Sequence, residues 1–378
     1  MSLSEEQAMF AETAAQFAAE HLRPNALKYD HEKYLDRDVF QALGALGFGG
    51  IYVREESGGS GLGRLDAALI FEELSKGCVS HATFLSIHNM STAMIDRYGS
   101  DEMRAQFLPK LISCDHLASY CLTEPNAGSD AGSLRTSAKR DGDHYVLNGA
   151  KVFISGGGFS DIYVVMARTG EDGPKGISAF VVEAGAPGLS FGKNEEKMGW
   201  RAQPTRMVNF DDCRILASHL LGVEGDGFKY AMAGLDGGRI NIAACSLGGA
   251  QEALNRSIAY SKDRRQFGQA IADFQATQFK LADMEIELQA ARALLYEAAR
   301  KLDDKAPDAT KFCAMAKRFV TDAGFKVAND ALQIHGGYGY LSEYEIERIV
   351  RDLRVHQILE GTNEIMRVII ARQLLGAR

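Results

Sequence analysis

The chain contains 378 residues and carries a formal net charge of −8, with acidic and basic side chains interleaved along its length. A length of this order favours two or three domains, and an acidic balance without a basic run argues against nucleic acid as the main partner. The six cysteines are scattered without a CxxC pair, which predicts free thiols in a reducing compartment.

No apolar run approaches the roughly 20 residues of a membrane-spanning helix, and no charged and then apolar leader opens the chain. These features predict a cytoplasmic protein without a membrane partner. The nine histidines show no HExxH or other ligand spacing, so we expect no metal site.

The first region, residues 1–117, shows the periodicity of helices. Ser4 and Gln7 match a capping box before a helix that the pattern ends at Pro24. Asp36 can cap a second helix. Beyond a glycine-rich loop, further helical patterns cover 64–76, 80–98 and 101–112.

The pattern changes in residues 118–228, where short β-rich runs alternate with Gly, Pro and Asn. Asp141–Gly142 and Asn148–Gly149 are typical of hairpin turns, and β-rich runs at 162–166 and 177–182 predict strands. We interpret this region as a separate β-domain.

Long helical patterns return in residues 229–378, the third predicted domain. Long helices without intervening strands favour a four-helix-type bundle over a parallel α/β sheet. The predicted architecture is therefore an N-terminal helical domain, a middle β-domain and a C-terminal helical bundle. The patterns of the third domain cover 228–262, 272–301, 307–335, 343–355 and 363–375.

The familiar phosphate-binding and nucleophile signatures do not identify a site. The chain has no GxGxxG and no GxxxxGK[ST] pattern. The stretch GLSFG at 188–192 matches GxSxG, but it lacks the strand–turn–helix elbow that a nucleophilic serine needs. We interpret that match as chance.

The segment SYCLTEPNAGSD, at 119–130, predicts a strand that runs into a turn of small, hydrogen-bonding residues. Backbone N–H groups of such a turn, with the hydroxyls of Thr123 and Ser129, can bind a polar ring edge or a phosphate. An ordinary turn between domains would look the same. A second predicted strand carries Phe153 and Ser155, an aromatic ring and a hydroxyl on one face.

Two segments at the ends of predicted helices could also bind a ligand. Arg264 and Arg265 can bind a pyrophosphate bidentately, although the same charges would complement a helix dipole. In QIHGGYG, at 333–339, the glycines would let the backbone approach a flat ligand, and a plain helix C-cap would explain them equally well.

One carboxylate near the C-terminus, Glu360, follows two aliphatic residues and precedes Gly361–Thr362, which supply a bend and an N-cap. Burial would raise the pKa of this carboxyl, whereas the positive end of the following helix would lower it. Two opposing effects on the pKa of one carboxyl are suited to a general base. A solvated glutamate beside a helix is the alternative that this stretch alone leaves open.

Six segments, taken together and in order, resemble the acyl-CoA dehydrogenase family from about residue 4 onward: YCLTEPNAGSD, FISGG, LDGGRINIA, RRQFG, QIHGGYGY and ILEGTNEIMR. The combination is specific because separated segments must all match in one order. Within the family, SYCLTEP, LDGGRINIA and RVHQILEGTNE are most similar to members that act on isobutyryl-CoA.

The resemblance implies a middle β-barrel domain, FAD in each subunit, and a homotetramer built as a dimer of dimers. It also implies an acyl-CoA substrate and electron-transferring flavoprotein as the electron acceptor. The turn at 120–129, backed by Phe153 and Ser155, is expected to contact the isoalloxazine, and a neighbouring subunit to supply Arg264 and the turn at 333–337. The residues expected to bind FAD are Tyr120, Leu122, Thr123, Gly128, Ser129, Phe153, Ile154, Ser155, Arg264, Phe267, Phe274, Gln275, Gln333, Gly336, Gly337, Thr362, Asn363 and Glu364.

For the reaction, the resemblance implies that Glu360 removes the α-proton of the acyl-CoA while a hydride leaves the β-carbon for FAD, giving a 2,3-enoyl-CoA. Some members carry this base on the helix just before the arginine that corresponds to Arg239. That position is Gly238 here, which leaves Glu360 as the candidate. The residues expected to contact substrate are Ser129, Asp236, Arg239, Gly361 and Arg372, and the acyl pocket is expected to involve 85–95, Leu359 and Gly237–Gly238.

Two positions depart from the family pattern. Asn126 stands where many members have Gly, and Phe153 where many have Trp. Asn tolerates the left-handed conformation and a phenyl ring can still stack, so flavin binding is expected to persist.

The expected reaction converts isobutyryl-CoA to methacrylyl-CoA. The alternatives are a dehydrogenase of straight-chain or 2-methylbutyryl-CoA, an oxidase on the same fold, and a non-catalytic relative.

Overall fold

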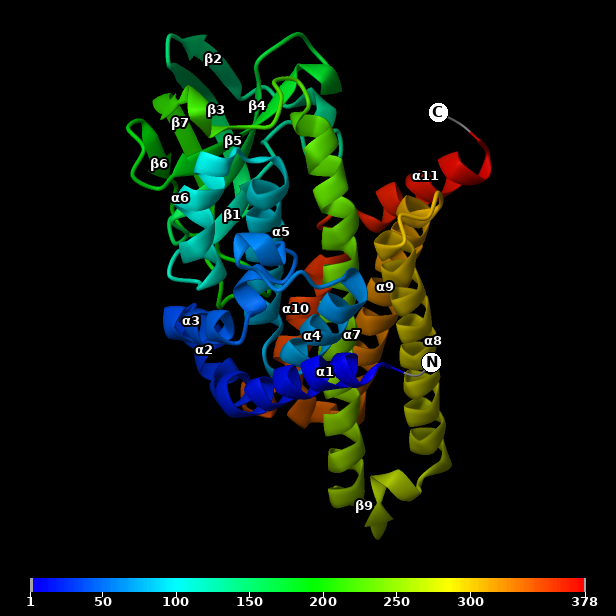
Figure 1. Ribbon diagram of the computed structural model, residues 1–378. Helices are drawn as coiled ribbons and strands as arrows, with labels where there is room; N and C mark the ends of the chain where they lie inside the picture. The colour runs from blue at the N-terminus through cyan, green and yellow to red at the C-terminus, as the bar shows by residue number, and fades with distance from the viewer. Residues whose placement is uncertain (1–2, 377–378) are drawn as a thin grey trace.

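The computed structural model describes residues 3–376, which fold into a helical region, a sheet and a second helical region in that order (Figure 1). The first helix, α1 (Glu5–Phe17), begins at the predicted capping box, in which Ser4 Oγ accepts a hydrogen bond from Gln7 N at 3.1 Å. It does not continue to Pro24, because a π-helical turn at Ala18–Leu22 follows it. The other helices of this region are α2 (Ala26–Glu32), α3 (Arg37–Ala45), α4 (Arg64–Gly77), α5 (Val79–Tyr98) and α6 (Asp101–Ile112).

The expected β-barrel domain is built on one eight-stranded sheet in the part of the chain that the structure describes. Its strand order runs β6-β7-β3-β2-β4-β5-β8, and β1 pairs with β4 in parallel. Among the described strands, β1 pairs with β4 alone and packs against α5, and from β1 the chain continues into the turn at 120–129. The strands are β1 (Ala118–Cys121), β2 (Ser137–Asp141), β3 (His144–Ser155), β4 (Ile162–Arg168), β5 (Ile177–Glu183), β6 (Leu189–Phe191), β7 (Thr205–Leu216) and β8 (Leu220–Leu221).

One predicted hairpin turn is wrong. Asn148–Gly149 lies within the continuous strand β3, at a β-bulge opposite β7, whereas the turn at Asp141–Gly142 does join β2 to β3. The Asn148 side chain pairs with Asp212 across the bulge, with Asp212 N donating to Asn148 Oδ1 at 2.9 Å. Gly149 has a φ of +144°, so an Asn-Gly pair suits a bulge as well as a turn.

The third region consists of α7 (Gly227–Asp263), α8 (Gln275–Asp303), α9 (Ala309–His335), α10 (Ile346–Arg354) and α11 (Asn363–Leu374). α7 runs through the middle of Figure 1, from the sheet to a small hairpin of β9 (Arg265–Gln266) and β10 (Gln269–Ala270), and α8 and α9 pack beside it. The predicted order of helical, β and helical domains is confirmed. None of the helices within residues 3–376 is both long and apolar enough to cross a membrane.

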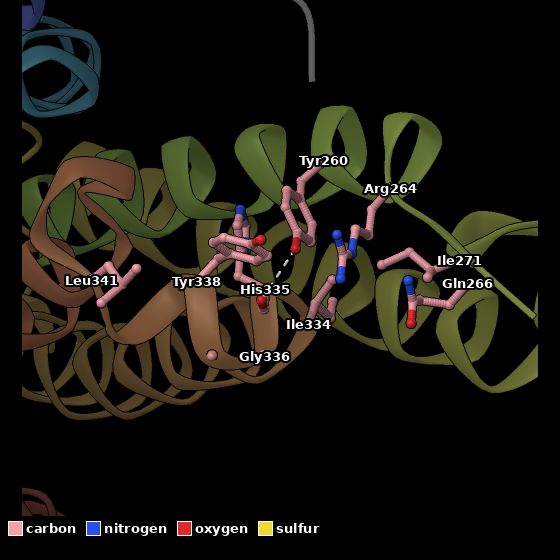
Figure 2. Close-up of a pocket in the computed structure, with 10 residues that line it drawn as sticks. Tyr260, Arg264, Gln266, Ile271, Ile334, His335, Gly336, Tyr338 and Leu341 are labelled. Carbon is pink, nitrogen blue, oxygen red and sulfur yellow. Dashed lines mark hydrogen bonds between the residues drawn. The ribbon is translucent and has the colours of Figure 1, made fainter.

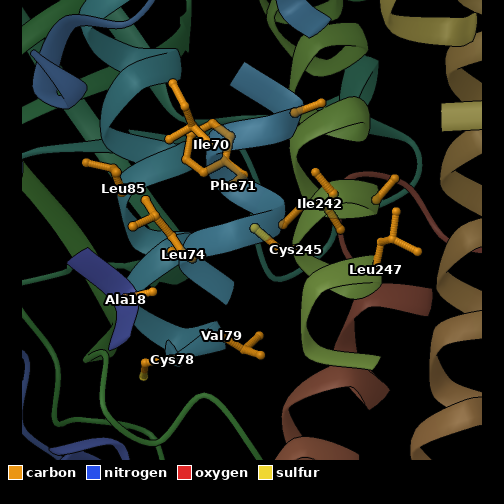
Figure 3. Close-up of a cluster of buried hydrophobic side chains, with 14 of the residues drawn as sticks. Ala18, Ile70, Phe71, Leu74, Cys78, Val79, Leu85, Ile242, Cys245 and Leu247 are labelled. Atoms are coloured by element: carbon orange, nitrogen blue, oxygen red, sulfur yellow. The ribbon is translucent and has the colours of Figure 1, made fainter. Parts of the chain in front are cut away.

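The core between the two helical regions depends on close contact of α4 with α7. Ile70, Phe71 and Leu74 of α4 are fully buried in one apolar cluster with Ile242 and Cys245 of α7 (Figure 3). Glycine allows this approach, because a Cβ at Gly248 would lie only 2.0 Å from the Glu72 carbonyl oxygen. All six cysteines are buried free thiols, as predicted.

A buried ion pair fixes the turn at 120–129 to β3. Lys151 is fully buried on β3, and its Nζ lies 2.7 Å from Glu124 Oε1 and 3.1 Å from the Leu122 carbonyl oxygen. The Glu124 carboxylate also accepts from the Thr136 backbone N–H at 2.9 Å. The Lys151–Glu124 pair therefore fixes the turn at 120–129, which was predicted to bind a ligand, to β3.

We expect Lys151→Met to destabilise the protein, because it leaves the Glu124 carboxylate buried without its cation, at a cost of about 3–5 kcal/mol. The measurement is the midpoint of thermal or urea unfolding. Lys139→Met, the same change at an exposed position of β2, serves as the control. Equal midpoints for the two variants would show that the pair does not anchor the turn.

Candidate functional site

Glu360 lies in the short connection between α10 and α11, and the backbone holds it in a left-handed conformation. Its φ is +57°, and the φ of Gly361 is +85°. For a residue with a side chain this conformation costs about 1–2 kcal/mol, so surrounding contacts must hold it. Thr362 then caps α11, its side chain accepting from Ile365 N at 3.3 Å. This confirms the predicted bend and N-cap.

The Glu360 carboxylate is buried against α7. Its Oε2 has no hydrogen-bond partner among the described residues, and a Cβ at Gly238 would lie 2.6 Å from that oxygen. Burial raises the pKa of Glu360 to about 7, against the opposing charges of Arg239 and Lys317. A buried, unpaired carboxyl with a pKa near neutrality is suited to accept a proton from a bound molecule.

Two cations contact the backbone next to this carboxylate. Arg239 Nε donates to the Glu360 carbonyl oxygen at 3.3 Å, and Lys317 Nζ donates to the Gly361 carbonyl oxygen at 2.8 Å. Arg239 is itself held by Asp236, with 2.6 Å between Nη1 and Oδ1. Lys317 was not identified from the sequence, although a lysine on the apolar face of the predicted helix 307–335 was a signal for it.

Tyr120, at the start of the turn at 120–129, lies near Glu360, and the bulge of β3 lies beside that turn. The Tyr120 hydroxyl is buried without a partner in residues 3–376; burial, and then the nearby Glu360 carboxylate, raise its pKa. The Val152 N–H donates to the Thr123 carbonyl oxygen at 2.9 Å, which places the bulge next to the turn.

Phe153 lies on that bulge, and its side chain is available to a ligand. It has a φ of +59° and remains 71 % exposed. An exposed aromatic ring on a strained bulge, next to a turn that begins at Tyr120, whose hydroxyl is unpaired among the described residues, fits a flat, partly polar ring. The residues present therefore fit the isoalloxazine expected here.

A second cluster lies where α7 ends and α9 meets the following 3₁₀ turn. A cavity of about 380 Å³ is lined there by Arg264, Tyr260, His335, Gly336 and others. Figure 2 shows Tyr260 and Arg264 from α7 facing Tyr338, and the Arg264 guanidinium lies 5.1 Å from the centre of the Tyr338 ring. An adjoining cavity of about 310 Å³ is lined by Ile271, Phe274, Ala276, Thr277, Lys280, Gln333 and Ile334.

The two clusters are far apart in one chain. Arg264 follows Gly238 by 26 positions along α7, which is about 39 Å at a rise of about 1.5 Å per residue. The two groups of residues predicted to bind FAD therefore lie in different parts of one chain.

Comparison with known proteins agrees with this geometry over almost the whole chain. The acyl-CoA dehydrogenase N-terminal, middle and C-terminal domain families match residues 4–115, 119–213 and 225–375. The chain belongs to the acyl-CoA dehydrogenase family. Members of this family are FAD-dependent oxidoreductases that act on a CH–CH bond of an acyl-CoA.

Individual relatives are similar over their full length. The mitochondrial isobutyryl-CoA dehydrogenase of Dictyostelium discoideum is 56 % identical over 99 % of this chain and 90 % of its own. The butyryl-CoA dehydrogenase structure from Megasphaera elsdenii has a TM-score of 0.96 at 41 % identity, covering 99 % of each chain. A structure described as the FAD complex of PigA has a TM-score of 0.95 at 32 % identity, covering 100 % of this chain and 99 % of its own.

Several predicted site residues of this acyl-CoA dehydrogenase take other positions. Asn363 is buried, and its amide contacts Lys317, Thr321 and Asp322 of α9 instead of facing a ligand. Arg372 is exposed about 14 Å along α11 from Asn363, away from Glu360. Within one chain, therefore, the Asn363 side chain packs against α9 and the Arg372 side chain lies on the exposed part of α11.

The other predicted residues divide between the two clusters. Asp236 contacts Arg239 and Thr310, so it acts on substrate through Arg239 at most. Leu122 and Ile154 are buried in the sheet, which leaves their backbones for contact. Gly128, Ser129 and Glu364 are exposed near the first cluster, Ser155 follows the bulge, and Phe267, Gln275 and Gly337 lie at the second, with Phe267 edge-on to Phe274 at 6.2 Å.

We expect Gly238→Ala to displace the Glu360 carboxylate, because the added methyl would lie 2.6 Å from Oε2. Flavin reduction by an acyl-CoA should slow by at least about tenfold, or about 1.4 kcal/mol of barrier, measured by anaerobic stopped-flow absorbance. Gly185→Ala, where an added Cβ would meet nothing within 4 Å, is the control for the effect of a glycine-to-alanine change outside the site. An unchanged reduction rate in Gly238→Ala would contradict the placement of the base.

Proposed function

We propose that this protein oxidises isobutyryl-CoA to methacrylyl-CoA, with Glu360 as the catalytic base. This assignment of the base rests on the Glu360 carboxylate, whose buried Oε2 lies against Gly238 and has no hydrogen-bond partner among the described residues. The higher identity to the isobutyryl-CoA dehydrogenase, 56 % against 41 % for the butyryl-CoA enzyme, supports the substrate.

In the proposed reaction the backbone N–H of Glu360 donates to the thioester carbonyl, which makes the α-proton more acidic. A carboxylate oxygen of Glu360 then takes that proton. FAD, when bound, supplies a hydride acceptor for the β-carbon. Exclusion of water by the bound acyl group further raises the pKa of Glu360, which brings it closer to that of the carbon acid.

We propose that FAD is shared between subunits. The turn at 120–129 and Phe153 would hold the isoalloxazine, while a neighbouring subunit would supply the Arg264 guanidinium for the pyrophosphate and the second cavity for the adenosine. The separation of the two clusters supports this arrangement and, with it, a homotetramer built as a dimer of dimers. By family resemblance, electron-transferring flavoprotein would reoxidise the flavin.

The glycines of α7 beside Glu360 support a short acyl chain. A Cβ at Gly234 would meet Met90 and Met94 at 3.6 Å, and one at Gly237 would lie 2.3 Å from Arg64 Nη1. Arg64 in turn lies over the Tyr52 ring at 3.8 Å. Thioethers and a packed guanidinium thus crowd the space beyond the base and leave little length for a long acyl chain.

One expected acyl-pocket residue does not line that space. Leu85 is fully buried in the core cluster shown in Figure 3, beside Ile70 and Phe71. The Met90 and Met94 side chains, five and nine residues further along α5, are the better candidates because they face α7.

Glu360→Gln should keep its bound yellow flavin but reduce it about 10²–10⁴-fold more slowly with isobutyryl-CoA, since the amide cannot accept the α-proton. Anaerobic stopped-flow absorbance measures this rate. Glu12→Gln, the same change at an exposed position of α1, should reduce flavin like the unmodified protein. Substantial bleaching of the Glu360 variant would refute the assignment.

A panel of isobutyryl-, butyryl-, 2-methylbutyryl-, isovaleryl- and octanoyl-CoA tests the substrate. We expect the fastest reduction with isobutyryl-CoA, by a margin of about 1–3 kcal/mol over butyryl-CoA, since the two differ only in the placement of a methyl group. Rapid bleaching only by octanoyl-CoA would contradict the branched-chain proposal. Oxygen uptake during turnover, measured alongside, would instead indicate an oxidase.

A further inference from the structure

The Glu360–Gly361 turn is held at both of its carbonyl groups. Arg239 of α7 contacts the first carbonyl oxygen at 3.3 Å, and Lys317 of α9 contacts the second at 2.8 Å. The same Lys317 ammonium donates to Asn363 Oδ1 at 2.9 Å, which joins the turn to the start of α11. Two cations from two helices therefore bind the backbone segment that carries the Glu360 side chain.

Lys317 is an unusual residue for this position. Its side chain is fully buried, and burial lowers the pKa of its ammonium to about 8, against the raising effect of the Glu360 charge. Burying an ammonium costs several kcal/mol unless it is paired and hydrogen-bonded. A neutral side chain could fill the same volume at a lower cost in free energy. The charge of Lys317 or its N–H donors must therefore have a role at this position.

We propose that Lys317 is a positioning residue for the catalytic base: its ammonium fixes the left-handed turn that directs the Glu360 carboxylate toward Gly238 and the bound substrate. This inference rests on the proposed role of Glu360. Lys317 does not touch the reacting atoms. It acts through the Gly361 carbonyl and the Asn363 amide, both of which it contacts directly.

The charge of Lys317 has a second effect, on when the base is ionised. The groups around Glu360 are Arg239 from α7, Tyr120 from β1 and Lys317 from α9. Burial raises the pKa of Tyr120, so it stays neutral at working pH. The two cations are the groups that oppose the effect of burial on the Glu360 carboxyl.

The other charged groups of this region act on Lys317 and not directly on the base. Asp322 from α9 and Glu364 from α11 raise the pKa of Lys317, while Arg239 lowers it. His356, next to Lys317, is buried with a pKa lowered to about 3 and is neutral. Lys317 is therefore charged at neutral pH and holds the pKa of Glu360 below the value that burial alone would produce.

The test is the pH dependence of flavin reduction by isobutyryl-CoA in FAD-loaded protein, measured anaerobically from about pH 5 to 9. A base must be ionised, so the second-order rate at low substrate, which reports the free protein, should rise with pH through an inflection near the Glu360 pKa of about 7. Loss of the Lys317 cation raises that pKa. In Lys317→Met the inflection should therefore move up by about one pH unit, and the plateau should fall by about tenfold because the turn is no longer held.

Three further variants separate position from general stability. Lys317→Arg keeps a cation and donors and should restore the inflection. Lys317→Gln keeps a donor without the charge, so it should show the shifted inflection even if the Met variant does not load flavin. Lys326→Met makes the same change at a half-exposed position of α9, nine residues on, and should match the unmodified protein.

A pH profile of Lys317→Met or Lys317→Gln that superimposes on that of the unmodified protein would overturn the inference. So would a uniform loss of rate at every pH that Lys317→Arg does not rescue, since that is the result of a purely structural lysine. Glu360→Gln keeps the two proposals apart. If that variant still reduces flavin, the base assignment fails; if it does not, while Lys317→Met behaves normally, only the positioning role fails.

Discussion

The close approach of other elements to α7 is the constraint on which the rest of the structure depends. Gly248 lets α4 pack against it with no side chain between them, and Gly238 leaves room for the Glu360 carboxylate. One long helix, Gly227–Asp263, thereby contacts the core at its centre and Glu360, the proposed base, nearer its start. At its end it contributes Tyr260 and Arg264 to a cavity. A side chain at either glycine would separate surfaces that must touch.

Opposing electrostatic effects determine the pKa of Glu360, the proposed base. Desolvation of Glu360 favours the protonated form, whereas Arg239 and Lys317 favour the anion, and the pKa settles near 7. The same two cations donate hydrogen bonds to the backbone carbonyls of Glu360 and Gly361. The position of the Glu360 side chain and the ionisation of its carboxyl therefore depend on the same two residues. A strained turn and two buried cations cost stability, which is usual where an active site needs one defined arrangement.

Local patterns predicted the elements well, and failed where one pattern serves two structures. The helices of the first and third regions followed from apolar spacing and caps such as Ser4 and Thr362, whose hydrogen bonds are local. Asn148–Gly149 suits both a hairpin turn and a bulge, and only pairing of β3 with β7 chose the bulge. Lys317 and Arg372 show the same limit, since side-chain burial depends on which helix packs above them.

The sequence by itself determined the family, the three-part architecture and the identity of the candidate base, because these rest on residue types in a specific order. It also showed that the rival position for the base is Gly238. Only the tertiary structure decided that Gly238 and Glu360, 122 positions apart, lie in contact, and that Lys317 binds the Gly361 carbonyl next to Glu360. Such contacts join distant parts of the chain, and no local pattern records the packing that brings them together.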